Sequence, residues 1–433
     1  MQSIPFHKPS IGPEEIEEVV DTLKSGWLTT GAKTKRFEAE FAAYVQRKHA
    51  VAVNSCTAAL HLALEAAGLD YGESVVVPTM TFAATAEVVR YFHARPILAD
   101  CRESDLNLDV ADAERRIQSA RARGEKVRAI IAVHYGGQVG DVAGLQALAR
   151  RHDLSIIEDA AHCCPAYFRE QTQAPWQSVG EIGDVSCFSF YANKTITTGE
   201  GGMACTDRDD LADRMRIMSL HGISRDAWKR FTSEGSWYYE IIAPGFKYNL
   251  TDIASSIGLR QLRKADELHR RRCQLAARYA DELGGVEELM LPSEQPDRIH
   301  AWHLDVVRLN LDLLSIDRAA MMEELKRAGI GASVHWMPLH MHPYYRKNYG
   351  FQPQDLPCAA WVYPQIISLP IYPDMTELEV ERVCDTLKTL IARHRKRRPV
   401  MPTPASLTPS AWIADAGPVP LRNAWANGYE AGR

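Results

Sequence analysis

Residues 186–203 read SCFSFYANKTITTGEGGM, an apolar run followed by a loop of small and polar residues that holds one lysine, Lys194. The apolar run predicts a buried strand over residues 185–190. A lysine that follows such a strand is partly desolvated, which lowers its pKa and frees its amine to form a Schiff base. Taken alone, a solvated surface lysine is the simpler interpretation.

A second buried strand ends in two carboxylates. Residues 154–162 read LSIIEDAAH, so Asp159 stands at the carboxyl end of the strand. A carboxylate buried there needs a cationic partner. Pyridoxal 5′-phosphate requires a Schiff-base lysine and an acid that keeps its ring nitrogen protonated, and Lys194 with Asp159 would supply both. The alternative role for Asp159 is to cap a helix that follows it.

A third stretch has the pattern of a phosphate cradle. Residues 51–59 read VAVNSCTAA, which predicts a strand, a small polar turn and a helix start. Free N–H groups at a helix N-terminus bind phosphate, and Thr57 adds a hydroxyl. The turn lacks both GxGxxG and GxxxxGK[ST], which argues against a dinucleotide or P-loop nucleotide site. Ordinary helix capping is the alternative.

An aromatic residue follows another predicted strand. Phe82, in VVVPTMTFAAT, is placed either to stack on a flat ring or to pack in the core.

Short apolar runs alternate with helical patterns between residues 13 and 260. Strands apolar on both faces that alternate with helices indicate an α/β fold with a mostly parallel sheet covered on both sides. Ligands of such sheets bind at the carboxyl ends of the strands. The predicted strands are residues 51–53, 74–77, 96–100, 128–133, 154–158 and 185–190. Farther along, residues 252–282 predict a long connecting helix, and 302–307 and 331–335 predict two more strands.

Composition narrows the class of protein. The 433 residues include 50 Lys and Arg and 55 Asp and Glu, so 50 − 55 gives a net charge of −5, which argues against bulk nucleic-acid binding. No apolar run is long enough to span a membrane, and the N-terminus does not read as a signal peptide. Nine scattered cysteines without a CxxC pair are typical of reduced thiols, so we expect a cytoplasmic protein.

These motifs occur together in one known family. The chain resembles the fold-type I, nucleotide-sugar aminotransferases of the DegT/StrS family over about residues 4–390. The resemblance rests on NSCTAALHLAL, VVVPTMTFAATAEVV, IIEDAAH, FSFYANKTITTGEGGM, GFKYNLTDIASSIGLRQL and HWMPLHMHPYY. It implies a large pyridoxal-phosphate domain with an N-terminal arm at 1–260 and a connecting helix with a smaller α+β domain at 261–398. Residues 399–433 are rich in proline and predict a flexible tail.

The resemblance also implies roles for single residues. Lys194 would bind the cofactor covalently, Asp159 would pair with its ring nitrogen, and His162 would lie near its phenolic oxygen. Phosphate contacts are implied for Cys56, Thr57 and Ser189, and ring stacking for Phe82. Cys56 stands where relatives usually have glycine.

Two further segments are implied to reach a site. GFKYNLTDI resembles a segment that enters the neighbouring subunit's site, with Asn249 or Lys247 as the phosphate contact. His335 and His340 lie in the stretch that the resemblance places near the sugar. With His342 they could suggest a metal, but no carboxylate or cysteine stands at ligand spacing, so we expect none.

The sequence thus predicts a homodimer with composite active sites. It would transfer an amino group, with L-glutamate as donor, to a nucleotide-linked keto sugar. A sugar dehydratase on the same scaffold is an alternative, but such relatives have histidine at the position of Lys194. A non-catalytic, ligand-sensing regulator is the other, and the intact lysine, acid and phosphate cradle argue against it.

Overall fold

The computed structural model describes residues 3–171, 173–224 and 239–396. Contacts group the chain into one unit, Met1–Arg395, and a second, Lys396–Arg433. The predicted tail at 399–433 lies outside the described residues.

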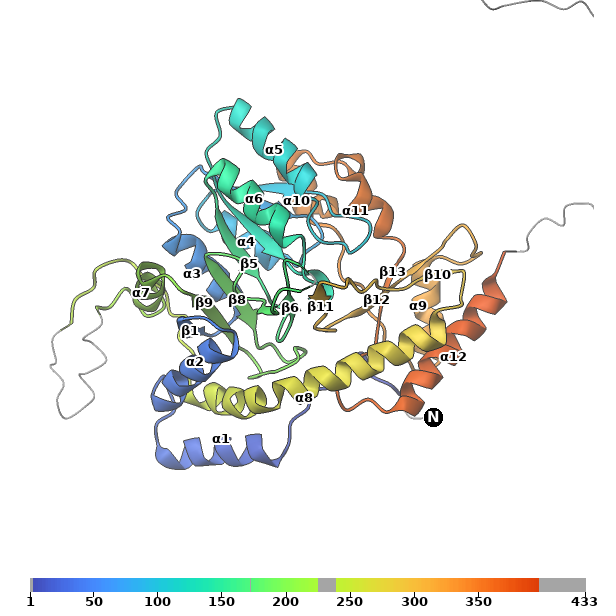
Figure 1. The fold of residues 1–433 in the computed structure, drawn as a ribbon, viewed down its shortest axis with the longest axis horizontal. Helices are drawn as coiled ribbons and strands as arrows, with labels where there is room; N and C mark the ends of the chain where they lie inside the picture. The colour runs from blue at the N-terminus through green and yellow to red at the C-terminus, as the bar shows by residue number, and fades with distance from the viewer. Residues whose placement is uncertain (1–2, 172, 225–238, 397–433) are drawn as a thin grey trace, which may run out of the picture. The chain divides into compact units, whose positions relative to one another are not determined.

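A seven-stranded sheet forms the centre of the first unit (Figure 1). The strands are, in spatial order, β1 (His49–Val53), β9 (Gly202–Thr206), β8 (Val185–Ser189), β5 (Ser155–Asp159), β4 (Val127–Val133), β2 (Ser74–Pro78) and β3 (Arg95–Ala99). The five strands from β8 to β3 pair in parallel, whereas β9 runs antiparallel to both of its neighbours. The predicted α/β class with a mostly parallel sheet is confirmed, and β9 is the strand that the sequence pattern missed.

Helices cover both faces of this sheet because its strands are apolar on both sides. In β2, Val75 and Val77 pack in the cluster that holds residues of α3 (Cys56–Ala66), α4 (Ala84–Arg90) and α7 (Asp209–Met218). Val76 points the other way, into the cluster of α5 (Val110–Ala122) and α6 (Val142–His152). Such two-sided burial of a strand is what a parallel sheet requires.

A 32-residue helix, α8 (Asp252–Leu283), links the sheet to the C-terminal part of the chain (Figure 1). Its N-terminal half packs on α1 (Pro13–Ser25) and α2 (Ala32–Tyr44), and Lys264 pairs with the buried Glu15 at 2.6 Å. Its far end packs on α12 (Glu377–His394), where Lys388 pairs with Glu282 at 2.9 Å. The predicted domain boundary at residue 260 falls inside α8 and stays a prediction.

The C-terminal part has its own antiparallel sheet, of β10 (Leu289–Met290), β12 (Asp305–Leu309) and β13 (Ile366–Leu369). The strand predicted over 302–307 begins only at Asp305, because Trp302 has a φ of 49°, outside the strand region. The strand predicted over 331–335 is wrong. Ser333 makes one isolated bridge to Ser368, while the N–H of Gly331 bonds to Ile4 of the N-terminal arm.

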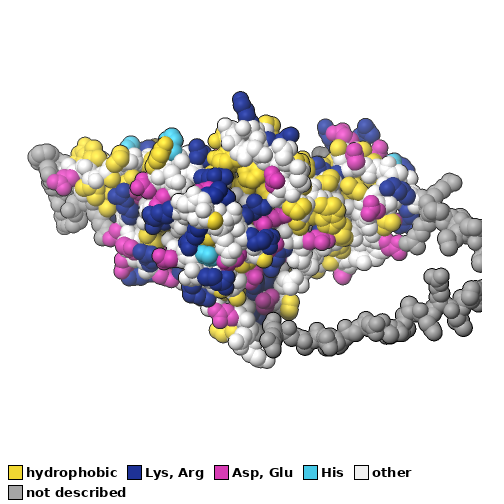
Figure 2. Space-filling model, turned by 90° about the horizontal axis from the view of Figure 1, so that it is seen from above, with side chains coloured by type: hydrophobic (Ala, Val, Ile, Leu, Met, Phe, Trp, Pro, Cys, Tyr) yellow, Lys and Arg dark blue, Asp and Glu magenta, His cyan; other side chains and the backbone are white. Residues whose placement is uncertain are grey.

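The remaining elements are short. They are β6 (Tyr167–Phe168), β7 (Gln177–Ser178), β11 (Arg298–Ile299), α9 (Arg318–Arg327), α10 (Pro343–Tyr349), α11 (Pro357–Val362) and the 3₁₀ turns Tyr135–Gly137, Leu339–Met341 and Pro353–Asp355. On the face in Figure 2, Lys and Arg side chains alternate with Asp and Glu. Among the described residues, no helix combines the length and the apolar character needed to cross a membrane.

Candidate active site

The predicted site residues gather in a cavity of about 520 Å³. Much of its lining comes from the carboxyl ends of four strands: residues 55–57 after β1, 81–84 after β2, 159–162 at the end of β5 and 189–194 at the end of β8. This is where ligands bind in open α/β sheets. The predicted residues that line it are Cys56, Thr57, Phe82, Asp159, His162, Ser189, Lys194 and His335.

Lys194 lies in the loop that follows β8, held by a bond from its N–H to the carbonyl of Tyr191. Its Nζ lies 3.5 Å from Nε2 of His303. Burial lowers the pKa of Lys194 to about 8, although negative charge on Cys56 or Asp159 would act in the opposite direction. An amine with this pKa is neutral in about a tenth of the molecules at pH 7, far more than an ordinary lysine, which suits a nucleophile.

Asp159 ends β5 and is 7% exposed. Its Oδ2 accepts from the hydroxyl of Thr85 at 2.8 Å, and its Oδ1 accepts from the N–H of Ala161 at 3.3 Å. Burial raises the pKa of this carboxyl, while the two hydrogen bonds and the charge of Lys194 oppose the rise. Residues 160–162 form no helix, so the structure does not support the alternative in which Asp159 caps one.

The first turn of α3 faces the cavity. Ser55 caps this helix by accepting from the N–H of Ala58 at 3.1 Å, and Cys56 and Thr57 carry the next backbone N–H groups at the cavity wall. The first N–H groups of a helix have no partner within it, so they are available to an anion. Cys56 Sγ donates to the carbonyl of Cys187 at 3.5 Å, and burial raises the pKa of this thiol well above its usual value, so it brings no negative charge.

Glycine at position 202 allows β9 to pass close to this turn. A Cβ there would lie 2.5 Å from the carbonyl carbon of Ser55 and 2.6 Å from the N of Cys56. Any side chain at Gly202 would therefore displace the start of α3.

Three aromatic rings form another wall. His162 stacks on Trp336, with centroids 5.1 Å apart and planes at 22°, and lies 4.3 Å from the ring of His303. Burial lowers the pKa of both histidines well below 6.5, so both are neutral. Neither Nδ1 has a hydrogen-bond partner among the described residues, which leaves two unpaired buried polar atoms on residues that line the cavity.

Phe82 and His335 complete the predicted set in this cavity. Phe82 is 60% exposed, so the alternative in which it packs in the core is wrong. Its ring centroid lies 6.5 Å from that of Trp336. His335 Nδ1 lies 2.8 Å from the hydroxyl of Ser368, and burial lowers its pKa to about 4.

Three predicted residues lie elsewhere. His340 is fully buried, with Nδ1 2.8 Å from the hydroxyl of Thr79. Lys247 Nζ donates to Oδ1 of Asn249 at 2.6 Å, and Asn249 Nδ2 donates to Thr30 at 2.7 Å. Asn249 lines a second cavity of about 770 Å³.

Sequence reasoning missed several lining residues. Tyr191 and Asn193 stand in the same loop as Lys194, and this closeness in sequence could have predicted them. His303 and Trp336 come from loops far along the chain, and no local motif marks either.

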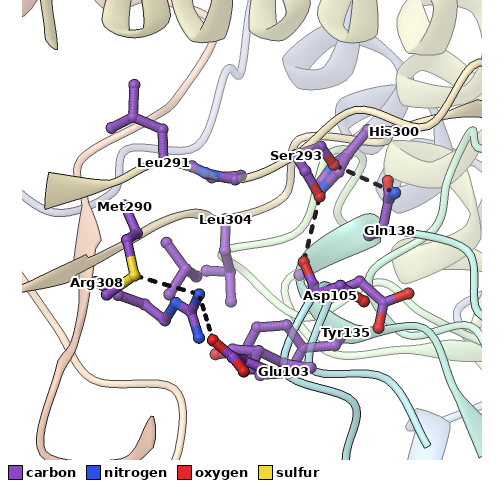
Figure 3. A pocket seen from close by; sticks show the side chains of 15 residues that line it. Glu103, Asp105, Tyr135, Gln138, Met290, Leu291, Ser293, His300, Leu304 and Arg308 are labelled. Carbon is purple, nitrogen blue, oxygen red and sulfur yellow. Dashed lines mark hydrogen bonds and ion pairs between the residues drawn. The ribbon is translucent and has the colours of Figure 1, made fainter. Parts of the chain in front are cut away.

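A smaller cavity, of about 60 Å³, lies beside the loops after β3 and β4 (Figure 3). Arg308 reaches the sulfur of Met290 at 3.5 Å and the carboxylate of Glu103 at 3.7 Å there, and Gln138 donates to the carbonyl of Ser293 at 3.5 Å. This volume holds a few water molecules at most, and Lys194 and Asp159 do not line it, so the cavity of about 520 Å³ that they line is the candidate site.

The Lys194 cavity fits pyridoxal 5′-phosphate. It offers an amine of lowered pKa, a buried carboxylate, a helix N-terminus with two hydroxyls, and unpaired buried atoms on His162, His303 and Asn193. Each is a group that this cofactor needs.

Comparison with known proteins agrees with the fold and gives the family. The DegT/DnrJ/EryC1/StrS aminotransferase family model matches residues 9–388, and the chain belongs to this family. The chain is 42% identical over 389 residues, 90% of this chain and 97% of the relative, to the spore coat polysaccharide biosynthesis protein SpsC of Bacillus subtilis.

Solved structures agree. Spr1654 of Streptococcus pneumoniae, in its PLP-form, superposes with a TM-score of 0.81 at 32% identity, covering 90% of this chain and 99% of that one. The sugar aminotransferase CalS13 of Micromonospora echinospora gives a TM-score of 0.77 at 30% identity, covering 89% and 99%. The protein is therefore a fold-type I, pyridoxal-phosphate-dependent sugar aminotransferase, which sets aside the dehydratase and the regulator.

Proposed function

We propose that the protein aminates a nucleotide-linked keto sugar with L-glutamate as donor. The observation that carries this proposal is the placement of Lys194 and Asp159 in one cavity, with a helix N-terminus and two hydroxyls beside them. The family and a relative named for polysaccharide biosynthesis support a sugar substrate.

The cavity residues divide the work of holding the cofactor. The N–H groups of Cys56 and Thr57 and the hydroxyl of Ser189 would bind the phosphate. Asp159 would keep the ring nitrogen protonated, because a carboxylate beside it favours the charged form of the ring. The neutral His162 would donate or accept a hydrogen bond at the phenolic oxygen, and Phe82 would cover one face of the ring.

Bound pyridoxal phosphate supplies an aldehyde that carries the amino group and a ring that accepts electrons. Lys194 would hold the cofactor through its amine until an amino donor binds. Its neutral amine would then take a proton from the donor's α-carbon, and its protonated form would return a proton when the keto sugar accepts the amino group. A pKa of about 8 is suited to both directions.

A homodimer with shared sites is the second part of the proposal. Neither Lys247 nor Asn249 lines the Lys194 cavity of its own chain, although their segment pairs with Val53 and Asn54 just before the start of α3, and Asn249 lines the second cavity. Two-fold pairing would let this segment reach the partner's phosphate. All nine cysteines are free, in keeping with a reducing, cytoplasmic environment.

The test is a coupled assay for 2-oxoglutarate with UDP-, dTDP- and GDP-linked 3-keto and 4-keto sugars. We expect one combination to be turned over, and Lys194→Ala to abolish that turnover. Lys326→Ala is the matched control, since that lysine is 79% exposed. If glutamate fails to bleach the yellow holoenzyme while another amino acid succeeds, the donor is wrong; if no nucleotide sugar reacts but a free sugar does, the substrate class is wrong.

A further inference from the structure

Two threonine hydroxyls stand in line behind Asp159. Thr85 Oγ1 lies 2.8 Å from Asp159 Oδ2, and Thr81 Oγ1 lies 2.7 Å from Thr85 Oγ1. All three side chains are buried. Thr81 lines the cavity, whereas Thr85, at the start of α4, does not.

The direction of these hydrogen bonds follows from counting hydrogens. An ionised carboxylate only accepts, so the single hydroxyl hydrogen of Thr85 points to Asp159. Thr85 is then the acceptor from Thr81. Both hydrogens point toward the carboxylate, and hydrogen bonds in such a chain polarise and strengthen one another.

Two hydrogen bonds to Asp159 also fix the plane of its carboxylate. Thr85 holds Oδ2, and the N–H of Ala161 holds Oδ1 at 3.3 Å. Asp159 therefore cannot turn about its last torsion without losing one bond. The other ionisable groups around it are Lys194 after β8, His134 after β4, and the buried thiols of Cys56, Cys163 and Cys187. Those thiols are neutral, because burial raises their pKa values far above the usual range.

We propose that Thr81 and Thr85 are positioning residues that keep Asp159 ionised and aimed into the cavity, so that it binds the protonated ring nitrogen of the cofactor. This inference rests on the role of Asp159 in the proposed function. Removing the Thr85 hydroxyl should weaken cofactor binding by about tenfold, because a carboxylate without this donor is more easily protonated and then no longer pairs with the ring nitrogen.

The experiment compares two probes on the apoenzyme. One is pyridoxal 5′-phosphate, and the other is its 1-deaza analogue, in which a carbon replaces the ring nitrogen. Dissociation constants are measured by quenching of tryptophan fluorescence. The constant for the analogue divided by the constant for pyridoxal phosphate isolates the contact between Asp159 and the nitrogen. Thr85→Val keeps the side-chain shape and removes the hydroxyl, whereas Thr85→Ser keeps the hydroxyl.

We expect Thr85→Val to lose about tenfold in affinity for pyridoxal phosphate and little for the analogue. Thr85→Ser should keep the ratio close to that of the wild type. Thr81→Val should lower the ratio, but by less than Thr85→Val does. Thr79→Val is the matched control, because Thr79 is equally buried but its hydroxyl bonds to His340. It should leave the ratio unchanged.

Equal losses for both probes in Thr85→Val would show a merely structural role and overturn the inference, as would an unchanged ratio in a folded variant. Asp159→Asn separates this from a failure of the proposed function. If Asp159→Asn lowers the ratio while Thr85→Val does not, only the threonine chain is wrong. If Asp159→Asn leaves the ratio unchanged, the role of Asp159 itself is wrong.

Discussion

Lys194 Nζ lies 3.5 Å from His303 Nε2, although the two residues are 109 positions apart in the chain. Burial and the charge of Lys194 lower the pKa of His303 well below 6.5, so the imidazole is neutral. The pKa of Lys194 is about 8, so at pH 7 most molecules carry an ammonium there, which donates to Nε2. Nδ1 of His303 then carries the ring proton.

The first prediction concerns stability against pH. The pKa of Lys194 falls from 10.5 to about 8 on folding, so the folded apoenzyme binds fewer protons than the unfolded chain between these values. The burial penalty is present in full below pH 8 and disappears as the pH rises toward 10.5. Apo Lys194→Met, which keeps the bulk without the charge, should therefore unfold at a higher temperature than the wild type at pH 7.

This advantage should shrink as the pH rises toward 10.5, and thermal unfolding at a series of pH values measures it. Lys326→Met, at an exposed position, should show no such trend. A difference for Lys194→Met that stays constant with pH would mean that its ammonium is not desolvated.

The second prediction tests the acceptor. His303→Phe removes the lone pair that stabilises the ammonium of Lys194, so the pKa of Lys194 should fall below about 8. His303→Gln offers an amide oxygen instead and should keep the pKa nearer its original value. The measurement is the pH dependence of acetic anhydride labelling of Lys194 in the apoenzyme, followed by peptide mass spectrometry. The same profile in both variants would show that His303 does not bond to the amine.

The strands that carry the site could be predicted because each is a run of consecutive apolar residues in the sequence. All six predicted strands of the central sheet occur within two residues of their expected positions, and eight predicted site residues line one cavity. Each of the four strand ends brings a short polar stretch to the same edge of the sheet, and that stretch is adjacent in sequence to an apolar run.

His303 and Trp336 could not be predicted because distant backbone contacts place them. The N–H of Ala301 bonds to the carbonyl of Gly137 at 2.9 Å, and this contact brings the loop of His303 to the sheet. Trp336 packs edge-on against Tyr135, 5.8 Å away. No periodicity in either loop encodes such contacts. For His340, the histidine-rich stretch suggested a site, yet its ring turns inward to Thr79.

The third prediction concerns Asp159. Asp159→Asn removes the negative charge that would keep the ring nitrogen protonated, and removing one partner of a buried pair costs about 3–5 kcal/mol. The half-reaction with glutamate should therefore slow by at least two orders of magnitude. Single-turnover bleaching of the cofactor absorbance measures this rate. Asp184→Asn is a control in the loop before β8, outside the cavity lining, where the carboxylate accepts from the N–H of Ile156 at 2.9 Å. A normal bleaching rate in Asp159→Asn would mean that Asp159 has only a structural role, as the acceptor from the N–H of Ala161.

The last prediction tests the shared sites. Lys247 and Asn249 are joined by a hydrogen bond of 2.6 Å, the Asn249 side chain bonds to Thr30, and neither residue lines the Lys194 cavity of its own chain. If they bind the partner's phosphate, each active site needs Lys194 from one subunit and this pair from the other. We therefore expect Lys194→Ala subunits and Lys247→Ala/Asn249→Ala subunits to be inactive separately.

Mixing them should restore part of the activity, because a heterodimer carries one site with both lesions and one intact site. With complete random exchange, half of the dimers are mixed and each holds one intact site out of two, so about a quarter of the wild-type activity should return. The fraction of heterodimer is measured by native mass spectrometry of differently tagged subunits. Subunits that exchange without any return of activity would place Lys247 and Asn249 in their own chain's structure rather than in the partner's site.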